Sequence, residues 1–224
     1  MYYWDIENTA TYNNKMGHYK TKSEFEFINR YLDSPKEILD IGGGSGRFAI
    51  PFQNGGHNVT VLDLSEPALT KLRERNSTIN LIQSDFFQWQ PSHENFYDLI
   101  LSIEVLLYIK DWNSFFNKVH RLLKKNGVFI FTATNKKSWR TILQKIKDKN
   151  QPDYNYSIYS LNDYKKIINE TNFRIDVLEG FLWIPCSINS NSKFVEIFAR
   201  IEKLFNLNRF YSQSPWLIFA VKKL

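Results

Sequence analysis

Glycine is concentrated at one place in this chain. Only nine of its 224 residues are glycine, yet four fall within five positions, at Gly42, Gly43, Gly44 and Gly46. This loop follows a short apolar run, ILDI, at residues 38–41. Glycine at such density serves a backbone that must turn tightly or approach another group closely. A strand, a glycine loop and a helix in that order are typical of α/β folds that bind phosphates or nucleosides at the helix amino terminus.

The segments around the loop alternate between strand and helix patterns. Strands are expected at residues 37–41, 58–64, 79–83, 97–103, 127–134, 173–180 and 215–224. Helices are expected at residues 21–31, 47–53, from 65 onward, 112–124, 161–171 and 194–205. Residues 1–20 form either a short helix or an arm. This alternation predicts an α/β fold in which helices cover both faces of a parallel sheet.

Composition excludes several other classes of protein. Hydrophobic residues make up 43% and charged residues 23%, which suits one globular domain over residues 1–224. The single cysteine excludes a disulfide framework and any multi-cysteine zinc or iron–sulfur site. The sequence contains no run of about 18 apolar residues and no signal-peptide pattern at its start, so a cytoplasmic protein without a membrane span is expected.

Two carboxylates accompany the glycine loop. Asp40 lies just before it, and Asp63 ends the second expected strand, 17 residues after Gly46. A carboxylate in that position can accept both ribose hydroxyls of a nucleoside. The dinucleotide fingerprint G-x-G-x-x-G fails from Gly42 but fits weakly from Gly44 to Ala49, so a nicotinamide or flavin cofactor stays open at this point.

Four segments over roughly residues 37–134 read EILDIGGGSGRFAIPF, VLDLSEPAL, QSDFFQW and YDLILSIEVLLYI. Taken together, they resemble the class I S-adenosylmethionine-dependent methyltransferases of the small-molecule type. The family has a glycine loop, a ribose-binding acid, an adenine-flanking acid and a substrate-facing segment after strand four, in that order. The resemblance implies a Rossmann-like fold whose seven-stranded, mostly parallel sheet has an antiparallel last strand.

The resemblance also implies a binding site for S-adenosylmethionine and its product S-adenosylhomocysteine. The methionine part would be bounded by Asp40, Gly42, Gly44 and Gly46, and the ribose hydroxyls would be held by Asp63. The remaining expected contacts are with the adenine or the far side of the cofactor: Leu64, Asp85, Phe86, Ser102 and Ile103. Asp63 and Asp85 also have a purely structural interpretation, which for Asp85 is the cap of a helix or turn.

Candidate catalytic residues come from two segments. Glu104 and Tyr108 follow strand four, where many relatives carry E-x-x-E-H; the second acid and the histidine are missing here. That departure argues against a histidine base and against a metal site, so no metal is expected. Residues 1–34 would close the pocket, with His18 as a catalytic candidate and Tyr19 as a cofactor contact. Glu104 would face the acceptor, contact the cofactor, or only cap a helix.

Two segments beyond the resemblance are expected to build the acceptor site, residues 135–160 and 182–214. The second contains an apolar stripe at residues 194–205 that could cap the pocket, form a dimer or lie on a membrane surface. The charges beside this stripe are mixed in sign, which disfavours an anionic bilayer. The oligomeric state is expected to be a monomer or a homodimer.

The leading functional hypothesis is methyl transfer by in-line displacement to a small-molecule acceptor, with an anionic compound such as a sugar nucleotide as one option. An RNA or protein methyltransferase is the first alternative, because residues 136–149 carry a net charge of +5. A net charge of +6 for the whole chain and the lack of an appended nucleic-acid module disfavour nucleic acid as the substrate. The second alternative is a non-catalytic partner that binds the cofactor.

Overall fold

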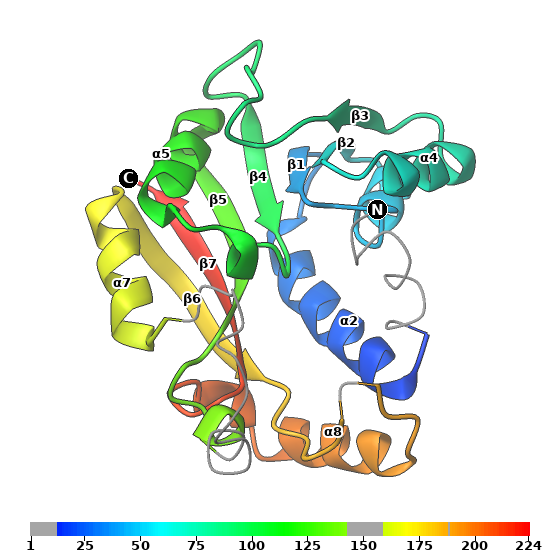
Figure 1. Ribbon diagram of the computed structural model, residues 1–224, viewed down its shortest axis with the longest axis vertical. Coiled ribbons are helices and arrows are strands. Elements are labelled where there is room, and N and C mark those ends of the chain that lie inside the picture. Colours follow the sequence, from blue (N-terminus) through cyan, green and yellow to red (C-terminus); the bar gives the residue numbers. More distant parts are fainter. Residues whose placement is uncertain (1–12, 143–158, 188) are drawn as a thin grey trace.

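The computed structural model describes residues 13–142, 159–187 and 189–224, and they form one mixed sheet covered by helices (Figure 1). The sheet has seven strands in the order β3-β2-β1-β4-β5-β7-β6. Their bounds are β1 (Glu37–Ile41), β2 (Asn58–Asp63), β3 (Asn80–Gln83), β4 (Tyr97–Ser102), β5 (Leu123–Thr134), β6 (Phe173–Phe181) and β7 (Trp216–Lys223). Strand β7 runs antiparallel to both β5 and β6, and the pairs among β1 to β5 are parallel. The predicted seven-stranded Rossmann-like fold with an antiparallel last strand is confirmed.

Helices cover both faces of this sheet, as predicted. One face carries α2 (Lys15–Ile28), α3 (Ala49–Asn54), α4 (Glu66–Arg75) and α8 (Phe194–Leu204). The other face carries α5 (Trp112–Leu122) and α7 (Leu161–Glu170). Three short 3-10 turns complete the described elements: η1 (Asn29–Tyr31), η2 (Leu106–Tyr108) and η3 (Leu207–Arg209).

The core consists of two apolar layers, one on each side of the sheet. Successive strand residues alternate between them, so that Ile38 and Leu99 belong to the layer under α2 whereas Leu39 and Ile100 belong to the layer under α5. Side chains of a strand point to opposite faces in turn, and a parallel strand covered on both faces is apolar throughout. This burial on both faces explains why ILDI and its neighbouring strands read as continuous apolar runs.

Two element boundaries differ from the sequence-based expectation. Helix α2 begins at Lys15 rather than at residue 21, because the Asn14 side chain caps it by accepting a hydrogen bond from the Gly17 N–H at 2.8 Å. Strand β5 begins at Leu123 rather than at 127, because α5 stops at Leu122 and Leu123 already pairs with Tyr97 of β4. Residues 1–12 of the predicted amino-terminal arm (residues 1–34), residues 143–158 of the first insertion and residue 188 of the second lie outside the described residues.

The parallel strands β1, β2 and β4 end at one edge of the sheet, and ligands of such folds bind at that edge. Figure 1 shows the amino-terminal end of α2 close to α8, at the lower end of the molecule. Among the described residues, no helix is long and apolar enough to span a membrane.

Candidate active site

The glycine loop leaves β1 in a conformation that only glycine adopts easily. Gly42, Gly44 and Gly46 have positive φ angles of 73°, 53° and 86°. A Cβ atom on Gly42 would lie 2.3 Å from Val105 Cγ2, and one on Gly46 would lie 2.4 Å from Leu72 Cδ1. The loop therefore packs directly against α4 and against the turn that follows β4.

Asp40, the residue before the last one of β1, packs against this loop. Its side chain is buried, and a Cβ on Gly43 would lie 2.6 Å from Asp40 Oδ2. That oxygen has no hydrogen-bond partner among the described residues. Burial raises the pKa of Asp40 to about 7, with Arg47 opposing the shift and Asp63 adding to it. A buried carboxyl of this kind is an orphan polar group that a ligand can satisfy.

Asp63 ends β2 and is oriented by backbone donors. Its two oxygens accept hydrogen bonds from the N–H groups of Gly44 and Ser65, each at 2.8 Å. The carboxylate is half-buried, whereas the next side chain, Leu64, is 48% exposed. An acid and an exposed apolar side chain are thereby set next to each other at the end of the strand, beside the glycine loop.

The segment after β3, which contains Asp85 and Phe86, forms a turn with hydrogen bonds between its own residues. Asp85 Oδ1 accepts hydrogen bonds from the N–H groups of Phe87 and Gln88, at 2.7 and 3.2 Å, as in a turn cap. Phe86 is buried, with its ring 4.7 Å from that of Phe115, so the exposed ring of this segment belongs to Phe87. The ammonium of Lys118 in α5 donates to the carbonyls of this turn, a support that sequence analysis did not identify.

The turn after β4 is strained. Ser102 and Ile103 are buried, and Ser102 Oγ has no hydrogen-bond partner among the described residues. Glu104 takes a positive φ of 66°, which is unusual for a residue with a side chain, and its N–H donates to Thr132 Oγ1 at 2.7 Å. Strained residues of this kind cluster at functional sites, where the surrounding contacts hold them.

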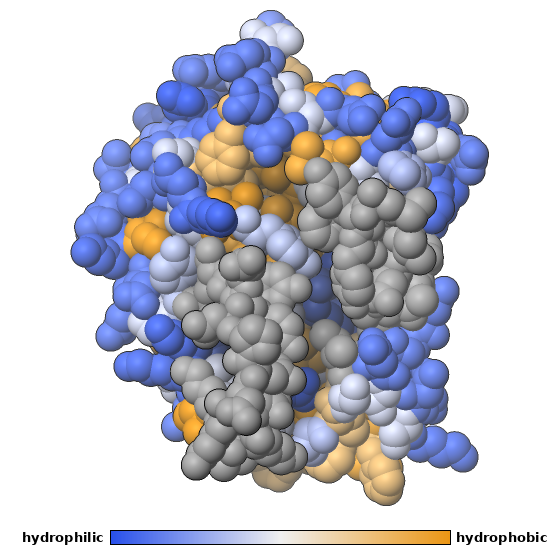
Figure 2. Space-filling model, in the orientation of Figure 1, coloured by the Kyte–Doolittle hydropathy of each residue, from blue (hydrophilic) through white to orange (hydrophobic). Residues whose placement is uncertain are grey.

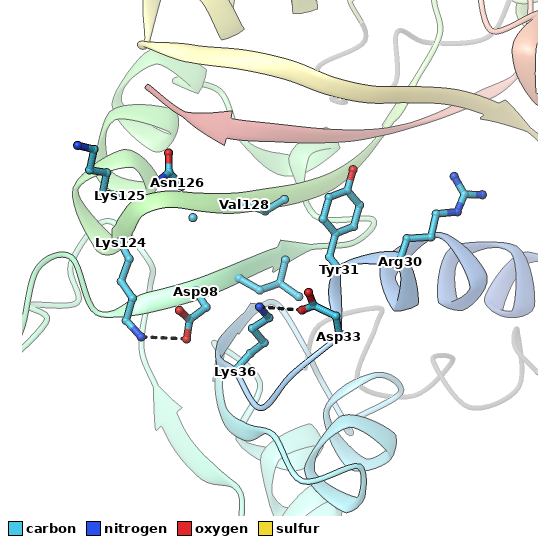
Figure 3. A pocket seen from close by; sticks show the side chains of 11 residues that line it. Arg30, Tyr31, Asp33, Lys36, Asp98, Lys124, Lys125, Asn126 and Val128 are labelled. Atoms are coloured by element: carbon cyan, nitrogen blue, oxygen red, sulfur yellow. Dashed lines mark hydrogen bonds and ion pairs between the residues drawn. The ribbon is translucent and has the colours of Figure 1, made fainter.

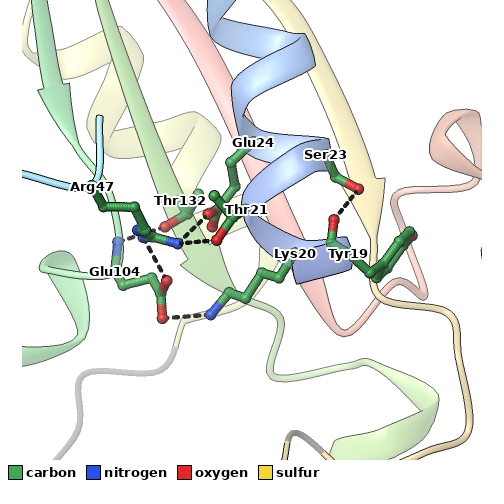
Figure 4. Close-up of polar contacts among 8 residues, drawn as sticks. All are labelled: Tyr19, Lys20, Thr21, Ser23, Glu24, Arg47, Glu104 and Thr132. Atoms are coloured by element: carbon green, nitrogen blue, oxygen red, sulfur yellow. Dashed lines mark hydrogen bonds and ion pairs between the residues drawn. The ribbon is translucent and has the colours of Figure 1, made fainter. Parts of the chain in front are cut away.

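Glu104 belongs to a cluster of two acids and two cations (Figure 4). Its carboxylate is paired with Lys20 of α2 and, at 2.8 Å, with Arg47. Arg47 also pairs with Glu24 of α2 at 2.8 Å and donates to Thr21 Oγ1 at 3.2 Å. Lys20 is 2% exposed and lies over the Trp216 ring. Helix α2 is thus joined to the glycine loop and to the turn after β4 by ion pairs between buried side chains of the helix and half-buried ones of the loop and turn.

His18 and Tyr19 lie on a different side of α2. Figure 4 shows Tyr19 pointing away from Lys20 and Glu104. Both residues line a groove of about 640 Å³ that also involves α8. There the Tyr19 hydroxyl is hydrogen-bonded to Glu202, whereas His18 is exposed. Lys20 therefore contacts Glu104, whereas His18 and Tyr19, the two residues predicted for this site, lie away from Glu104. The third candidate, Tyr108, is 46% exposed in η2.

The described parts of the two insertions meet each other. The Arg140 guanidinium donates to the carbonyls of Ile184 and Cys186 at 2.6 and 3.0 Å. Asn135 Nδ2 donates to the Ser212 carbonyl at 2.9 Å. Residues 135–142 therefore contact the segments that follow β6 and precede β7. Arg140 is used in this internal contact rather than in an open basic surface, and residues 143–149 of the basic segment lie outside the described residues.

A smaller pocket of about 230 Å³ lies at the opposite end of the sheet (Figure 3). It contains the ion pairs Lys124–Asp98 at 2.9 Å and Lys36–Asp33 at 3.0 Å. Because it borders the amino ends of β4 and β5, it lies away from the edge where parallel sheets bind ligands. Over the described part of the chain, no group of three His, Cys, Asp or Glu side chains is arranged to hold a metal ion.

Comparisons with known proteins identify the family of this chain. A family model described as a methyltransferase domain matches residues 14–178. The ubiquinone biosynthesis O-methyltransferase of Rickettsia akari is 30% identical over 169 residues, which cover 70% of this chain and 66% of that protein. The malonyl-[acyl-carrier protein] O-methyltransferase 2 of Ilyobacter polytropus is 27% identical over 169 residues, covering 67% of this chain and 64% of that protein.

The chain thus spans slightly less than two thirds of the length of these two relatives. Among solved structures, an S-adenosylmethionine-dependent methyltransferase from Mesorhizobium loti superposes with a TM-score of 0.65 at 21% identity. That match covers 90% of this chain and 98% of the other. The fold, the glycine loop and the family match all agree: the chain belongs to the class I S-adenosylmethionine-dependent methyltransferases.

Proposed function

We propose that this chain transfers a methyl group from S-adenosylmethionine to an oxygen atom of a small-molecule acceptor. The observation that carries the proposal is the glycine cradle at the carboxyl end of β1, with Asp40 beneath it and Asp63 beside it. Two relatives are named O-methyltransferases, which favours oxygen over nitrogen or carbon as the acceptor atom. An anionic acceptor and a cytoplasmic location are parts of the same proposal.

The residues at this edge suit the cofactor. The positive φ angles of Gly42, Gly44 and Gly46 let the loop turn tightly beside Asp40 and Asp63, where the methionine part would pass. The orphan oxygens of Asp40 and Ser102 are buried polar atoms that a polar ligand can satisfy. Asp63 would bind the ribose hydroxyls.

Two further segments would hold the adenine. The exposed apolar side chain of Leu64 would pack against the plane of the adenine ring. Asp85 would meet the amino group, with the exposed Phe87 ring nearby in place of the buried Phe86.

When bound, the cofactor supplies a methyl carbon that is activated by its sulfonium. The chain then has to hold a nucleophile about 3 Å away, aligned and shielded from water. Helix α2 and the turn after β4 form one wall for this purpose, joined by the Lys20–Glu104–Arg47 pairs. The two insertions, which meet through Arg140 and Asn135, would form the acceptor side.

Within this proposal Glu104 positions groups rather than removing a proton. Lys20 and Arg47 already bond to its oxygens and compete with any substrate proton for the same lone pairs. Tyr108, exposed in the next turn, is the better candidate for direct contact with the acceptor. His18 would contact only an acceptor that enters through the groove between α2 and α8.

Isothermal titration tests the cofactor. S-adenosylmethionine should bind and NAD should not, and Asp63→Ala should weaken binding by about 1.5–3 kcal/mol, the cost of lost hydrogen bonds to a charged group. Asp33→Ala, at the opposite end of the sheet, is the matched control and should bind normally. Binding of NAD without binding of S-adenosylmethionine would overturn the proposal.

Formation of S-adenosylhomocysteine tests the transfer. A panel of phenols and carboxylic acids should contain an acceptor, and turnover should persist in EDTA. Release of product only with RNA or a protein would establish the alternative substrate class. Cofactor binding without turnover on any acceptor would establish the non-catalytic alternative. Loss of activity in EDTA that magnesium restores would show that a metal takes part.

A further inference from the structure

Helix α8 presents a wide apolar surface to solvent. Its buried side is formed by Val195 and Glu202 and packs toward α2. The apolar stripe on its outer side continues to the end of the following turn, with side chains between 38% and 75% exposed. Its members are Phe194, Ile197, Ile201, Leu204, Phe205 and Phe210. Figure 2 shows apolar residues gathered over α8 at the lower end of the molecule. Exposed apolar side chains gathered in this way mark an interaction surface.

The charges around this stripe are positive once the ion pairs are considered. Glu196 is paired with Lys15 of α2 at 2.6 Å, and Glu202 is buried. Lys193, Arg200 and Arg209 form no ion pair with another described residue. The mixed signs in the sequence therefore conceal a cationic border, and the sequence-based argument against an anionic bilayer does not hold.

The size of the stripe argues against a second copy of the chain as its partner. Helix α8 has 11 residues, so it is about 16 Å long and about 10 Å wide and covers about 160 Å² in projection. A stable dimer buries about 800 Å² of accessible surface on each partner, so two copies would need contacts well beyond this helix. A lipid surface needs no matching patch, since apolar side chains enter the acyl boundary while cations meet the headgroups.

We propose that α8 and Phe210 form an interfacial surface that binds membranes containing anionic phospholipids. The helix is amphipathic in the way that interfacial helices are: aromatic and aliphatic side chains lie on one side, and Lys193 and Arg200 lie at the border of that side. Its attachment to α2 is fixed by the Lys15–Glu196 pair and by the hydrogen bond between Tyr19 and Glu202. This surface is independent of the proposed transfer reaction, because it rests on binding alone.

Vesicle sedimentation of the full chain tests this surface. The protein should bind equimolar phosphatidylglycerol–phosphatidylcholine vesicles more strongly than phosphatidylcholine alone. Leu204→Ser should reduce that binding by about tenfold, the effect of withdrawing one leucine from an apolar phase. Leu224→Ser is the matched control, since the two leucines are 75% and 71% exposed and Leu224 follows β7, outside α8. Both exposed substitutions should leave the fold intact by circular dichroism.

A second variant tests the charge. Arg200→Gln should lower binding to the anionic vesicles by about fivefold and leave binding to phosphatidylcholine unchanged. The proposal is overturned if the protein sediments with neither vesicle, or if Leu204→Ser and Leu224→Ser reduce binding equally. It is also overturned if light scattering shows a stable dimer that Leu204→Ser dissociates, because the stripe is then a contact between copies.

Discussion

Helix α2 is held by a buried carboxylate on each of two sides, and the two carboxylates have different partners. On the side of the glycine loop, Glu24 meets the Arg47 guanidinium at 2.8 Å. On the side of α8, Glu202 meets the Tyr19 hydroxyl and the backbone N–H of Trp183 at 3.3 Å. Burial raises the pKa of both groups above the usual range. Only Glu24 has a cation that opposes this shift directly.

The different partners of Glu24 and Glu202 represent two ways of holding α2 in place. A cation beside a buried carboxylate favours the charged form and limits the rise of its pKa, and removal of either partner leaves the other charge without compensation. A carboxylate held by a hydroxyl and backbone N–H groups can take up a proton without leaving an unpaired cation. The loop side of α2 should therefore be sensitive to mutation, and the α8 side should be sensitive to pH.

The largest effect is expected for Arg47→Met. This change leaves Glu24 fully buried without its cation, and the free energy of unfolding should fall by about 3–5 kcal/mol in urea denaturation. Lys36→Met, which breaks the Lys36–Asp33 pair near solvent, is the control and should cost at most about 1 kcal/mol. Adding Glu24→Gln to Arg47→Met should recover part of the loss. Equal losses for Arg47→Met and Lys36→Met would contradict the comparison.

Much of the loop side could be predicted from sequence because its signals are local. The glycine spacing and Asp63 at the end of an apolar strand are properties of neighbouring residues, and the structure places them together. The cluster around Glu104 could not be predicted in that way. Lys20 and Glu24 lie about eighty residues before Glu104 in the chain, and only packing brings them to Glu104 and Arg47. Their one visible signal is a pair of charges four residues apart on one side of α2, which periodicity alone assigns to solvent.

The α8 side was predicted less well for a different reason. The sequence indicates an amphipathic helix at residues 194–205, but its buried side is chosen by the contact with α2 and not by the width of the apolar stripe. Val195 and Glu202 are buried, whereas Phe194 and Leu204 are exposed. Glu202 is buried where Phe194 is not because the Tyr19 hydroxyl and the Trp183 N–H donate to its carboxylate, and both donors are distant from α8 in sequence.

The next effect in size is expected for Lys20→Met. The change removes one cation from Glu104 and keeps the length and apolar stem of a side chain that is 2% exposed. The free energy of unfolding should fall by about 2 kcal/mol, as for the loss of a hydrogen bond to a charged group. Lys22→Met on the same helix is the matched control, because Lys22 is exposed and its pair with Glu26 is 4.0 Å long. Its cost should stay below about 0.5 kcal/mol, and similar costs for both variants would rule out a special role for Lys20.

The α8 side should respond to pH. Burial raises the pKa of Glu202 from 4.5 to about 7, so the folded protein binds more protons than the unfolded chain between these values. Stability from this group is full below pH 4.5 and is lost as pH rises toward 7. Glu202→Gln should lower the slope by about 1 kcal/mol per pH unit, and the slope that is left comes from Asp40 and Glu24, whose pKa values burial also raises. An unchanged slope in the variant, measured by urea denaturation from pH 4.5 to 7.5, would show that another buried acid is responsible.

The smallest effect is expected for Tyr19→Phe, which removes the hydroxyl from Glu202 and leaves the backbone donors in place. The loss should be about 0.5–1.5 kcal/mol at neutral pH, and smaller near pH 5 because protonated Glu202 is a weaker acceptor. Tyr31→Phe is the control, since that hydroxyl donates to the Asp176 carboxylate at 2.9 Å in an exposed contact. Combined with Glu202→Gln, Tyr19→Phe should cost less than it does alone, because both changes act on one hydrogen bond. A loss of about 3 kcal/mol or more would instead mean that Glu202 stays charged and depends on Tyr19 as Glu24 depends on Arg47, and the two sides of α2 would then be alike.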